Sequence, residues 1–337
     1  MNLQLSITQS VLLFLFSGAV IWYFSNKLSA IVEFIADEFN LGDAFGGTIM
    51  LAIVTNLPEI VIVVIGVQKG DTSLALGNIL GGIAIQTVLL VLFDFASRKN
   101  EDKPLSTLTS NRNSIAQGLF LCAILALVIM GSRFDEKFVM QNVSPIEAMI
   151  LGSWILSLFV IKQCEAQKML PKIECEMIHR TKLTKKSALI QLIIVALIIL
   201  FFGVLLANTG EKIAAHYNIS GVVFGATILS LITATPEISG GLAFVKHKRY
   251  PPLISDIFGG NSFLPTLFFV ANILAGRSIL TDAHNSDIYL TSLSIVLTAV
   301  YLLGMIIQSP KRKWGMGIDS WIAVLIYIGG VIGLLLI

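Results

Sequence analysis

Charged residues, histidine and cysteine are all scarce in this chain of 337 residues, and each shortage excludes a class of protein. Only 13% of the residues are Asp, Glu, Lys or Arg, whereas 55% are hydrophobic, and a soluble globular domain carries roughly 25% charged residues. The three cysteines cannot form a disulfide framework, and their spacing matches no zinc site. The four histidines all fall outside the apolar runs, which argues against an intramembrane metalloprotease and against soft transition metals.

Apolar runs long enough to cross a bilayer recur along the whole chain. A span needs about 20 apolar residues, whereas a membrane β-barrel would show short alternating segments, which are absent from the sequence. The sequence therefore predicts an all-α polytopic membrane protein with about ten transmembrane helices. The predicted spans are residues 7–25, 44–68, 72–96, 113–132, 145–163, 187–208, 220–245, 251–275, 286–308 and 316–337.

Basic residues are concentrated in alternate loops between these spans. One set of loops holds 18 of the 23 Lys and Arg residues. By the positive-inside rule this set faces the cytoplasm, so both termini are expected on the non-cytoplasmic side of a plasma or inner membrane. The other set holds Lys69, Arg133, Lys137, Lys212 and Arg277.

The chain contains one long stretch twice, with corresponding residues 178 positions apart. EFIADEFNL at 33–41 matches EKIAAHYNI at 211–219, and TNLPEI from Thr55 matches TATPEI from Thr233. Five spans per copy force the second copy to enter the membrane from the opposite side. We therefore predict two inverted repeats, with a binding site near the bilayer midplane where they meet. The expected division is a first half at 1–163, a cytoplasmic linker at 164–186 and a second half at 187–337.

Several other polar residues are expected to cap helices. Ser144 and Glu147 form a capping box around Pro145, while Asp43 and Asp287 are expected to cap the second and ninth spans. The linker is expected to be solvated and partly helical, without the dense oxygen ligands that an EF-hand-like calcium sensor needs.

Glu59 and Glu237 lie in the middle of apolar spans, at equivalent repeat positions. A carboxylate at the bilayer centre costs at least about 2.5 kcal/mol, so such residues usually serve a function. If the repeats are inverted, the two side chains should meet near the pseudo-two-fold axis. Their joint charge would suit one divalent cation, two monovalent ions or two protons, which provides a physical basis for antiport.

Proline precedes each of these glutamates and changes the helix around it. Because proline has no N–H, the carbonyls of Val54 and Ile232 lose their helical partners and the helix bends. Together with the hydroxyls of Thr55 and Thr233, these carbonyls could supply several of the six to eight oxygens that Ca²⁺ prefers.

The helix after each Pro-Glu motif carries glycines and further polar residues. The two segments read ALGNILGGIAIQ and ISDIFGGNSFLP, and their GG pairs at 81–82 and 259–260 are equivalent. Close helix packing explains glycine pairs of this kind. Asn78 and Asp256 also occupy equivalent positions, and we expect them to contribute to the site directly or through water.

Both motifs resemble the α-repeats of the cation/calcium exchanger superfamily, the sodium/calcium exchangers especially. That family carries a G-T-S-x-P-E signature and then a G-N-x-x-G-S-N-like signature, where this chain reads VTNLPE with GNILGGIAIQ and ITATPE with SDIFGGNSFL. The resemblance covers both repeats and implies ten helices, outward termini and alternating access, with the first and sixth helices sliding across the rest. Long first and sixth helices that end in the repeated EFIADEFNL and EKIAAHYNI would fit that role.

The resemblance also implies roles for individual residues. Glu59 and Glu237 match the central calcium carboxylates. Thr55 and Thr233 match residues that supply oxygens, and Ala52 and Ser230 match positions that line sodium sites.

The chain departs from the family pattern at several hydroxyl positions. The serine after the first threonine is Asn56 here, and Ala234 in the second repeat. The glycine-motif serines are Gly82 and Gly260, and the following polar position is Gln86 in one repeat but Leu264 in the other. These losses weaken the expected sodium sites more than the calcium site.

The leading hypothesis is thus an antiporter, not an enzyme, that moves a divalent cation, Ca²⁺ first, in exchange for Na⁺. A proton-coupled exchanger for Ca²⁺ or another cation such as Mn²⁺ is the alternative. A diverged family member with other cation selectivity and a scaffold that binds ions without transporting them also remain open. The expected partners are inorganic cations and the lipid bilayer, with no nucleic acid and no cofactor.

Overall fold

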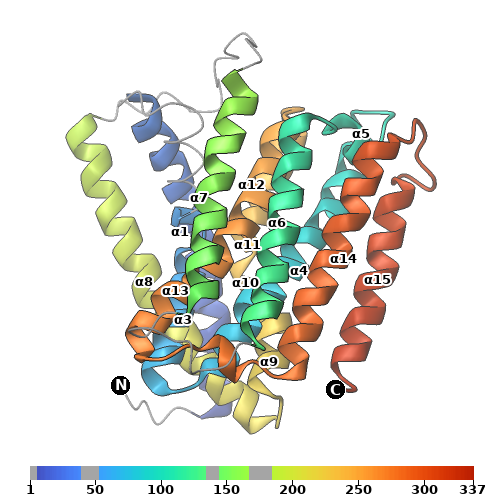
Figure 1. Cartoon of the computed structure of the whole chain (residues 1–337). Helices are drawn as coiled ribbons and strands as arrows, with labels where there is room; N and C mark the ends of the chain where they lie inside the picture. Colours follow the sequence, from blue (N-terminus) through green and yellow to red (C-terminus); the bar gives the residue numbers. More distant parts are fainter. Residues whose placement is uncertain (1–5, 39–52, 134–143, 167–183) are drawn as a thin grey trace.

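The predicted apolar spans form helices in the computed structural model of the chain (Figure 1). The structure describes residues 6–38, 53–133, 144–166 and 184–337, and no β-strand occurs within these ranges. The elements are α1 (Ile7–Glu38), α3 (Leu57–Lys69), α4 (Thr72–Ser97), α5 (Leu105–Leu108), α6 (Arg112–Gly131), α7 (Pro145–Ala166), α8 (Lys185–His216), α9 (Gly221–Phe224), the π-helix η3 (Gly225–Leu229), α10 (Ser230–Thr233), α11 (Thr235–Lys246), α12 (Tyr250–Phe263), η4 (Leu264–Thr266), α13 (Leu267–Ala275), η5 (Leu280–Asp282), α14 (Asn285–Ile307) and α15 (Ile318–Leu334).

The all-helical polytopic fold class is confirmed. Seven of the described helices are long and apolar enough to cross a membrane, and the bent pair at 221–246 makes an eighth span. α15 is a shorter apolar helix of 17 residues. The second predicted span, 44–68, is described only from residue 53 onward.

Four spans differ from the prediction in their length or regularity. α1 and α8 each have 32 residues and continue well beyond the predicted ends at 25 and 208, because the repeated polar-ended segments extend the helix past its apolar part. The span predicted at 251–275 is interrupted at η4, where Pro265 cannot donate a helical hydrogen bond. The span predicted at 220–245 bends by 45° between α10 and α11.

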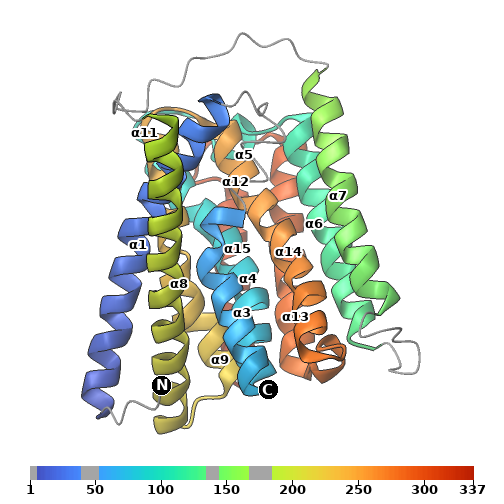
Figure 2. The same cartoon turned by 90° about the vertical axis from the view of Figure 1, so that its left-hand side faces the viewer.

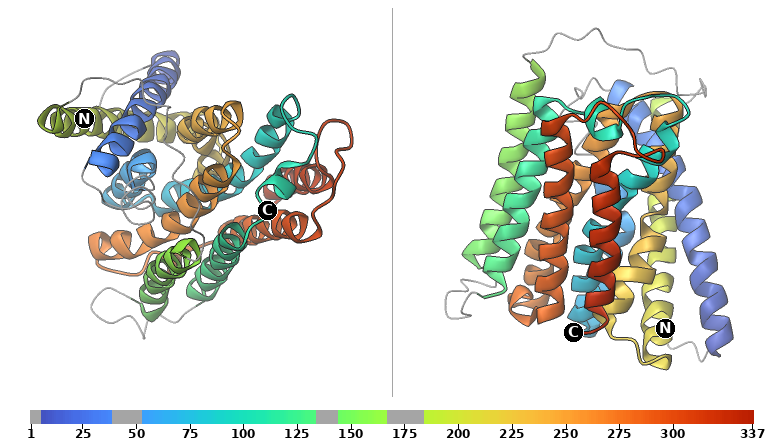
Figure 3. Two further views of the ribbon diagram at one scale, coloured as in Figure 1. Left: turned by 90° about the horizontal axis from the view of Figure 1, so that it is seen from above. Right: turned by 90° about the vertical axis from the view of Figure 1, so that its right-hand side faces the viewer.

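α1 and α8 lie side by side at one edge of the bundle (Figure 2). Each helix leaves a row of large apolar side chains exposed, which suits a surface that faces lipid. The pair contacts the remaining helices mainly through α3 and α11, with smaller contacts to α9 and α10. Figure 3 shows it at the periphery when the molecule is viewed from above. The exposed side chains include Leu12, Leu15, Phe16, Tyr23, Ile193, Ile194, Leu197 and Phe201.

α4 is buried along most of its length and joins the two halves. It packs against α3 in its own half and against α9, η3, α14 and α15 in the second half. The halves are therefore interleaved rather than placed end to end, as expected of two repeats that share a central site.

The basic loops at 98–103, 246–249 and 311–313 gather at one end of the bundle, named the basic face here. The Lys248 amine donates to the Asn100 carbonyl, and the Arg312 guanidinium donates to the carbonyls of Glu101 and Lys103. The start of α1 and the end of α15 lie at the other end, named the termini face here (Figure 1). There Lys69 pairs with Glu211.

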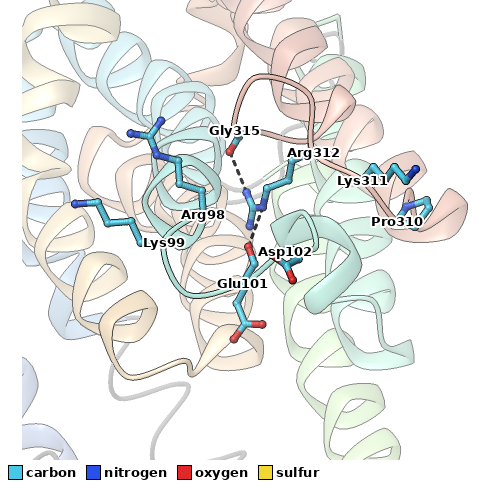
Figure 4. A pocket seen from close by; sticks show the side chains of 8 residues that line it. All are labelled: Arg98, Lys99, Glu101, Asp102, Pro310, Lys311, Arg312 and Gly315. Atoms are coloured by element: carbon cyan, nitrogen blue, oxygen red, sulfur yellow. Dashed lines mark hydrogen bonds between the residues drawn. The ribbon is translucent and has the colours of Figure 1, made fainter.

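A buried ion pair fixes the basic face. Asp94, at the end of α4, is fully buried and accepts hydrogen bonds from Arg312 Nη1 at 2.8 Å and from Ser320 Oγ at 2.7 Å. The backbone N–H groups of Leu105 and Gly317 also donate to this carboxylate. In Figure 4 the Arg312 side chain extends from the 310–315 loop to the backbone carbonyl of Glu101. The carboxylate thus ties α4, α5, α15 and the loop before α15 together.

Replacing Asp94 by asparagine should destabilise the fold strongly. The substitution leaves the largely buried Arg312 charge without its anion, and breaking a buried pair in this way costs about 3–5 kcal/mol. Thermal unfolding in detergent should show a markedly lower midpoint. Lys311→Gln, in the same loop but exposed, is the control and should unfold like the wild type; equal midpoints for the two variants would contradict the role of Asp94.

The expected helix caps are also present where they can be compared. The Ser144 N–H donates to Glu147 Oε2 at 3.0 Å, and the Ile146 N–H donates to Ser144 Oγ at 3.3 Å. The His284 N–H donates to Asp287 Oδ2 at 2.8 Å. Asp43 lies outside the described residues, as does most of the linker at 164–186.

Candidate cation-binding site

Each Pro-Glu motif begins a new helix in the middle of the bundle. Asn56 and Ala234 are turn residues, and proline lies at the start of both α3 and α11. Glu59 and Glu237 therefore occupy the first turns of these helices. The positive end of a helix dipole stabilises an anionic side chain at that position, which offsets part of the cost of burying it.

The carbonyl freed by Pro236 is partly satisfied by a neighbouring hydroxyl. Thr235 Oγ1 donates to the Ile232 carbonyl at 2.7 Å. The sequence prediction treated this oxygen as spare, and the hydrogen bond uses one of its two lone pairs. Leu57, the repeat equivalent of Thr235, has no hydroxyl that could do the same for Val54.

The two glutamates come together in the interior, as the inverted repeats predict. Only 1% of Glu59 and 4% of Glu237 is exposed, and the two groups are close enough to interact electrostatically. The Thr233 hydroxyl of the second repeat is a hydrogen-bond partner of the Glu59 carboxylate in the first repeat. In each glutamate, Oε2 has no hydrogen-bond partner among the described residues. A pair of buried acids with unused oxygens is an arrangement that a cation would complete.

Side-chain amides from α4 and α12 lie buried in the same core. Asn78 is fully buried and neither of its amide atoms has a hydrogen-bond partner in the described part of the chain. The same holds for Nε2 of Gln86 and Oδ1 of Asn261. Such unsatisfied groups are costly in a buried setting, so their concentration on the two motif helices favours a polar occupant.

A π-helical turn positions Ser230 against α4. The turn spans η3, and the Ser230 hydroxyl lies 2.6 Å from the Gly225 carbonyl and 3.1 Å from the Asn78 carbonyl. Single π-turns in a helix often occur at functional sites because they shift side chains out of the regular register.

The glycines of the two motifs have different surroundings. A Cβ added at Gly81 would lie 2.1 Å from the Ala226 Cα, so the glycine allows α4 and η3 to touch. At Gly82 the nearest atom to such a Cβ would be Ser230 Oγ at 3.8 Å, and at Gly260 it would be Asn56 Nδ2 at 3.5 Å. Gly81 therefore matches the expectation of close packing, whereas Gly82 and Gly260 leave room beside polar groups.

Alanine substitutions at neighbouring positions should separate these two roles. Gly81→Ala forces α4 away from η3 and should destabilise the protein by about 1–3 kcal/mol, the usual cost of overpacking. Gly82→Ala meets no close atom and should leave stability unchanged. Unfolding midpoints of the two purified variants provide the test, and equal destabilisation would show that Gly82 is also a packing residue.

The remaining predicted site residues differ in how deeply they are buried. Thr55 and Asn56 are buried beside Pro58 at the start of α3, while Asp256 is partly exposed on α12. Ala52 lies outside the described residues.

Asn261 and Thr87 join the motif helices and were not among the predicted site residues. The Asn261 amide donates to Thr87 Oγ1 at 3.2 Å and to the Ile83 carbonyl at 3.4 Å. The sequence gives only one indication of them: Asn261 directly follows Gly260 and Thr87 directly follows Gln86, and both preceding residues belong to the motifs. Pro265 replaces Thr87 in the other repeat, so the repeat comparison did not reveal the pair.

Two further observations limit the location of the site. In the described ranges, no three His, Cys, Asp or Glu side chains are grouped as metal ligands, so hydroxyl, amide and carbonyl oxygens would have to complete a cation shell around two acids. The surface pocket in Figure 4 lies on the basic face, and its lysine and arginine side chains point in different directions. It is not part of the glutamate site.

The sequence profile of the sodium/calcium exchanger protein family matches residues 9–161 and 187–336. The chain therefore belongs to that family. Membership establishes a cation/Ca²⁺ exchanger-type membrane transporter rather than an enzyme.

Two relatives are similar to this chain over most of their length. The chain is 23% identical to the putative antiporter CaxA of Alkalimonas amylolytica over 302 residues, which is 88% of this chain and 89% of the relative. It is also 23% identical to the uncharacterized membrane protein MJ0091 of Methanocaldococcus jannaschii over 311 residues, 89% of this chain and 91% of the relative.

Solved structures share the fold at low sequence identity. The H⁺/Ca²⁺ exchanger CAX has a TM-score of 0.66 at 13% identity, covering 97% of this chain and 87% of that one. Native YfkE has a TM-score of 0.64 at 16% identity, covering 97% and 93%. The sodium-calcium exchanger NCX_Mj soaked with 2.5 mM Na⁺ and 1 mM Sr²⁺ has a TM-score of 0.61 at 20% identity, covering 96% and 97%.

Proposed function

We propose that this protein is a secondary active antiporter that moves a divalent cation, Ca²⁺ in the first place, across the membrane in exchange for Na⁺. The observation that carries the proposal is the convergence of Glu59 and Glu237, both buried and each with an unused carboxylate oxygen. Two negative charges neutralise one Ca²⁺ or two monovalent cations, but not both together. Competition for one charged site therefore couples the opposing fluxes.

The surrounding side chains take supporting roles in this proposal. The oxygens of Thr55, Thr233, Ser230, Asn56 and Gln86 complete the shell around the two acids, directly or through water, with Asn78 and Asp256 close by. Carboxylate, amide, hydroxyl and carbonyl oxygens are the hard ligands that Ca²⁺ prefers.

Transport would proceed by alternating access around this fixed site. α1 and α8 pack mainly against each other and form the moving pair, which slides across the rest of the bundle. The basic face is assigned to the cytoplasm and both termini to the other side, on the positive-inside rule. The halves at 1–163 and 187–337 are the two repeats, joined by the linker at 164–186.

A proton is the second candidate for the coupling ion, on one specific observation. Neither Gly82 nor Gly260 offers a side-chain oxygen, although the backbone leaves room for one at both positions. Sodium needs additional oxygen ligands, whereas two facing carboxyl groups can each accept a proton without them. The names of the structural neighbours include both a sodium-calcium and an H⁺/Ca²⁺ exchanger.

Equilibrium binding of radioactive calcium to the detergent-purified protein tests the site and the coupling ion together. We expect saturable Ca²⁺ binding that Na⁺ displaces and that K⁺ does not. Proton coupling would instead release about two protons per bound Ca²⁺ in weakly buffered solution, because the ligands must deprotonate. Folded protein without saturable Ca²⁺ binding would overturn calcium as the substrate, and Mn²⁺ would be the next cation to measure.

A further inference from the structure

The two repeats differ in charge at one pair of equivalent positions beside the glutamates. Asn78 and Asp256 each lie six residues after the start of their helix, α4 or α12. At 1.5 Å per residue, each is about 9 Å along the axis from that helix end. α4 begins at the termini face and α12 begins at the basic face, so the amide and the carboxylate approach the central pair from opposite sides.

Asp256 is connected to both the central site and the basic face. It lies close enough to Glu237 for the two charges to interact, and it is partly exposed, whereas Asn78 is fully buried. The adjacent Ser255 hydroxyl accepts a hydrogen bond from Gln117 Nε2 of α6 at 3.0 Å, which fixes this turn of α12. Asp256 does not form a three-acid group with the two glutamates in the described part of the chain. It is therefore a neighbour of the site rather than a third acid in one ligand shell.

A carboxylate near the basic face changes the electrostatic barrier that a cation meets there. Loops rich in lysine and arginine repel an approaching cation. A fixed negative charge part of the way along the approach lowers that barrier and raises the local cation concentration. Asn78 supplies only a dipole at the equivalent point of the other approach.

We infer that Asp256 receives divalent cations on their way between the basic face and Glu237, so that the two approaches to the site differ in cation affinity. The inference rests on the proposed function and adds a direction-dependent property that two equal repeats would lack. It predicts a lower apparent half-saturation concentration for Ca²⁺ at the basic face than at the termini face.

Calcium uptake into right-side-out and inside-out membrane vesicles tests this inference. Accessibility of a thiol introduced by Lys311→Cys identifies which face is outward. Asp256→Asn should raise the half-saturation concentration at the basic face by about tenfold, within the range of electrostatic focusing, and leave the termini face unchanged. Asp256→Glu should behave like the wild type.

The swap Asn78→Asp with Asp256→Asn provides the decisive control, because it conserves total charge. It should move the higher affinity to the termini face. Equal changes at both faces, or none at either, would overturn the inference, since a ligand in the shell or a merely structural residue would act without regard to side. Unfolding midpoints show whether each variant folds. Absence of flux in the wild type itself would overturn the proposed function and this inference with it.

Discussion

Replacing Glu237 by glutamine is expected to reduce calcium exchange at least ~100-fold while the protein remains folded. The variant leaves one carboxylate to neutralise a buried divalent cation, and removing one partner from a buried charge pair costs about 3–5 kcal/mol. Each 1.4 kcal/mol corresponds to a tenfold change in affinity. Glutamine keeps the size of the side chain, so the packing at the start of α11 should persist.

Glu59→Gln should behave like Glu237→Gln, because the two residues occupy equivalent repeat positions. Glu147→Gln is the matched control. Glu147 is also a fully buried glutamate, but it accepts hydrogen bonds from Ser144 and Ser278 instead of lying with the other two. Its loss should lower stability and leave the calcium affinity of the folded fraction unchanged. Full exchange by folded Glu237→Gln would remove the central carboxylate pair from the mechanism.

Introducing serine at both Gly82 and Gly260 should increase sodium-driven calcium exchange by roughly tenfold. Each new hydroxyl would enter a space whose nearest atoms belong to Ser230 or Asn56, at 3.8 and 3.5 Å from the added Cβ. A hydrogen-bonding or ligand oxygen beside a charged group contributes about 1.5–3 kcal/mol, and 1.4 kcal/mol is tenfold. The readout is the sodium dependence of calcium uptake at fixed pH.

The alanine pair, Gly82→Ala with Gly260→Ala, is the control for this gain. It adds the same carbon atoms without the oxygens, so any effect of helix propensity or packing appears in both double variants. Sodium dependence should increase only with serine. The same response in the serine and alanine pairs would mean that the two positions do not contribute to a sodium site.

Much of the fold could be predicted from the sequence because the bilayer leaves few alternatives. Long apolar runs can only be helices in lipid, and the distribution of Lys and Arg places the loops on two faces. The repeat offset of 178 residues also predicts that Glu59 lies opposite Glu237. A hydropathy criterion alone ends the first and sixth spans at 25 and 208, where polar residues begin. The repeated segments EFIADEFNL and EKIAAHYNI indicate longer helices, and α1 and α8 do continue into them.

Features that depend on local geometry or on distant pairing could not be predicted. The π-turn at Gly225–Leu229 has no clear sequence signal, although it sets the position of Ser230. The Arg312–Asp94 ion pair joins residues that are 218 positions apart in the sequence. Which carboxylate Arg312 contacts depends on how the helices pack, so the pairing could not be predicted from the sequence. The GG motif does not show that Gly81 and Gly82 have different surroundings. Consecutive residues point to different sides of α4, so Gly81 packs against η3 whereas Gly82 lies beside the Ser230 hydroxyl.

Radioactive calcium uptake by the wild-type protein in sealed proteoliposomes tests the central claim most directly. Vesicles loaded with sodium, with potassium, or at a pH different from the outside separate the possible driving gradients. We predict calcium accumulation with sodium inside and none with potassium inside; accumulation driven only by the pH difference would identify the proton as the coupling ion. No accumulation under any of these gradients, with folded protein in tight vesicles, would contradict calcium antiport.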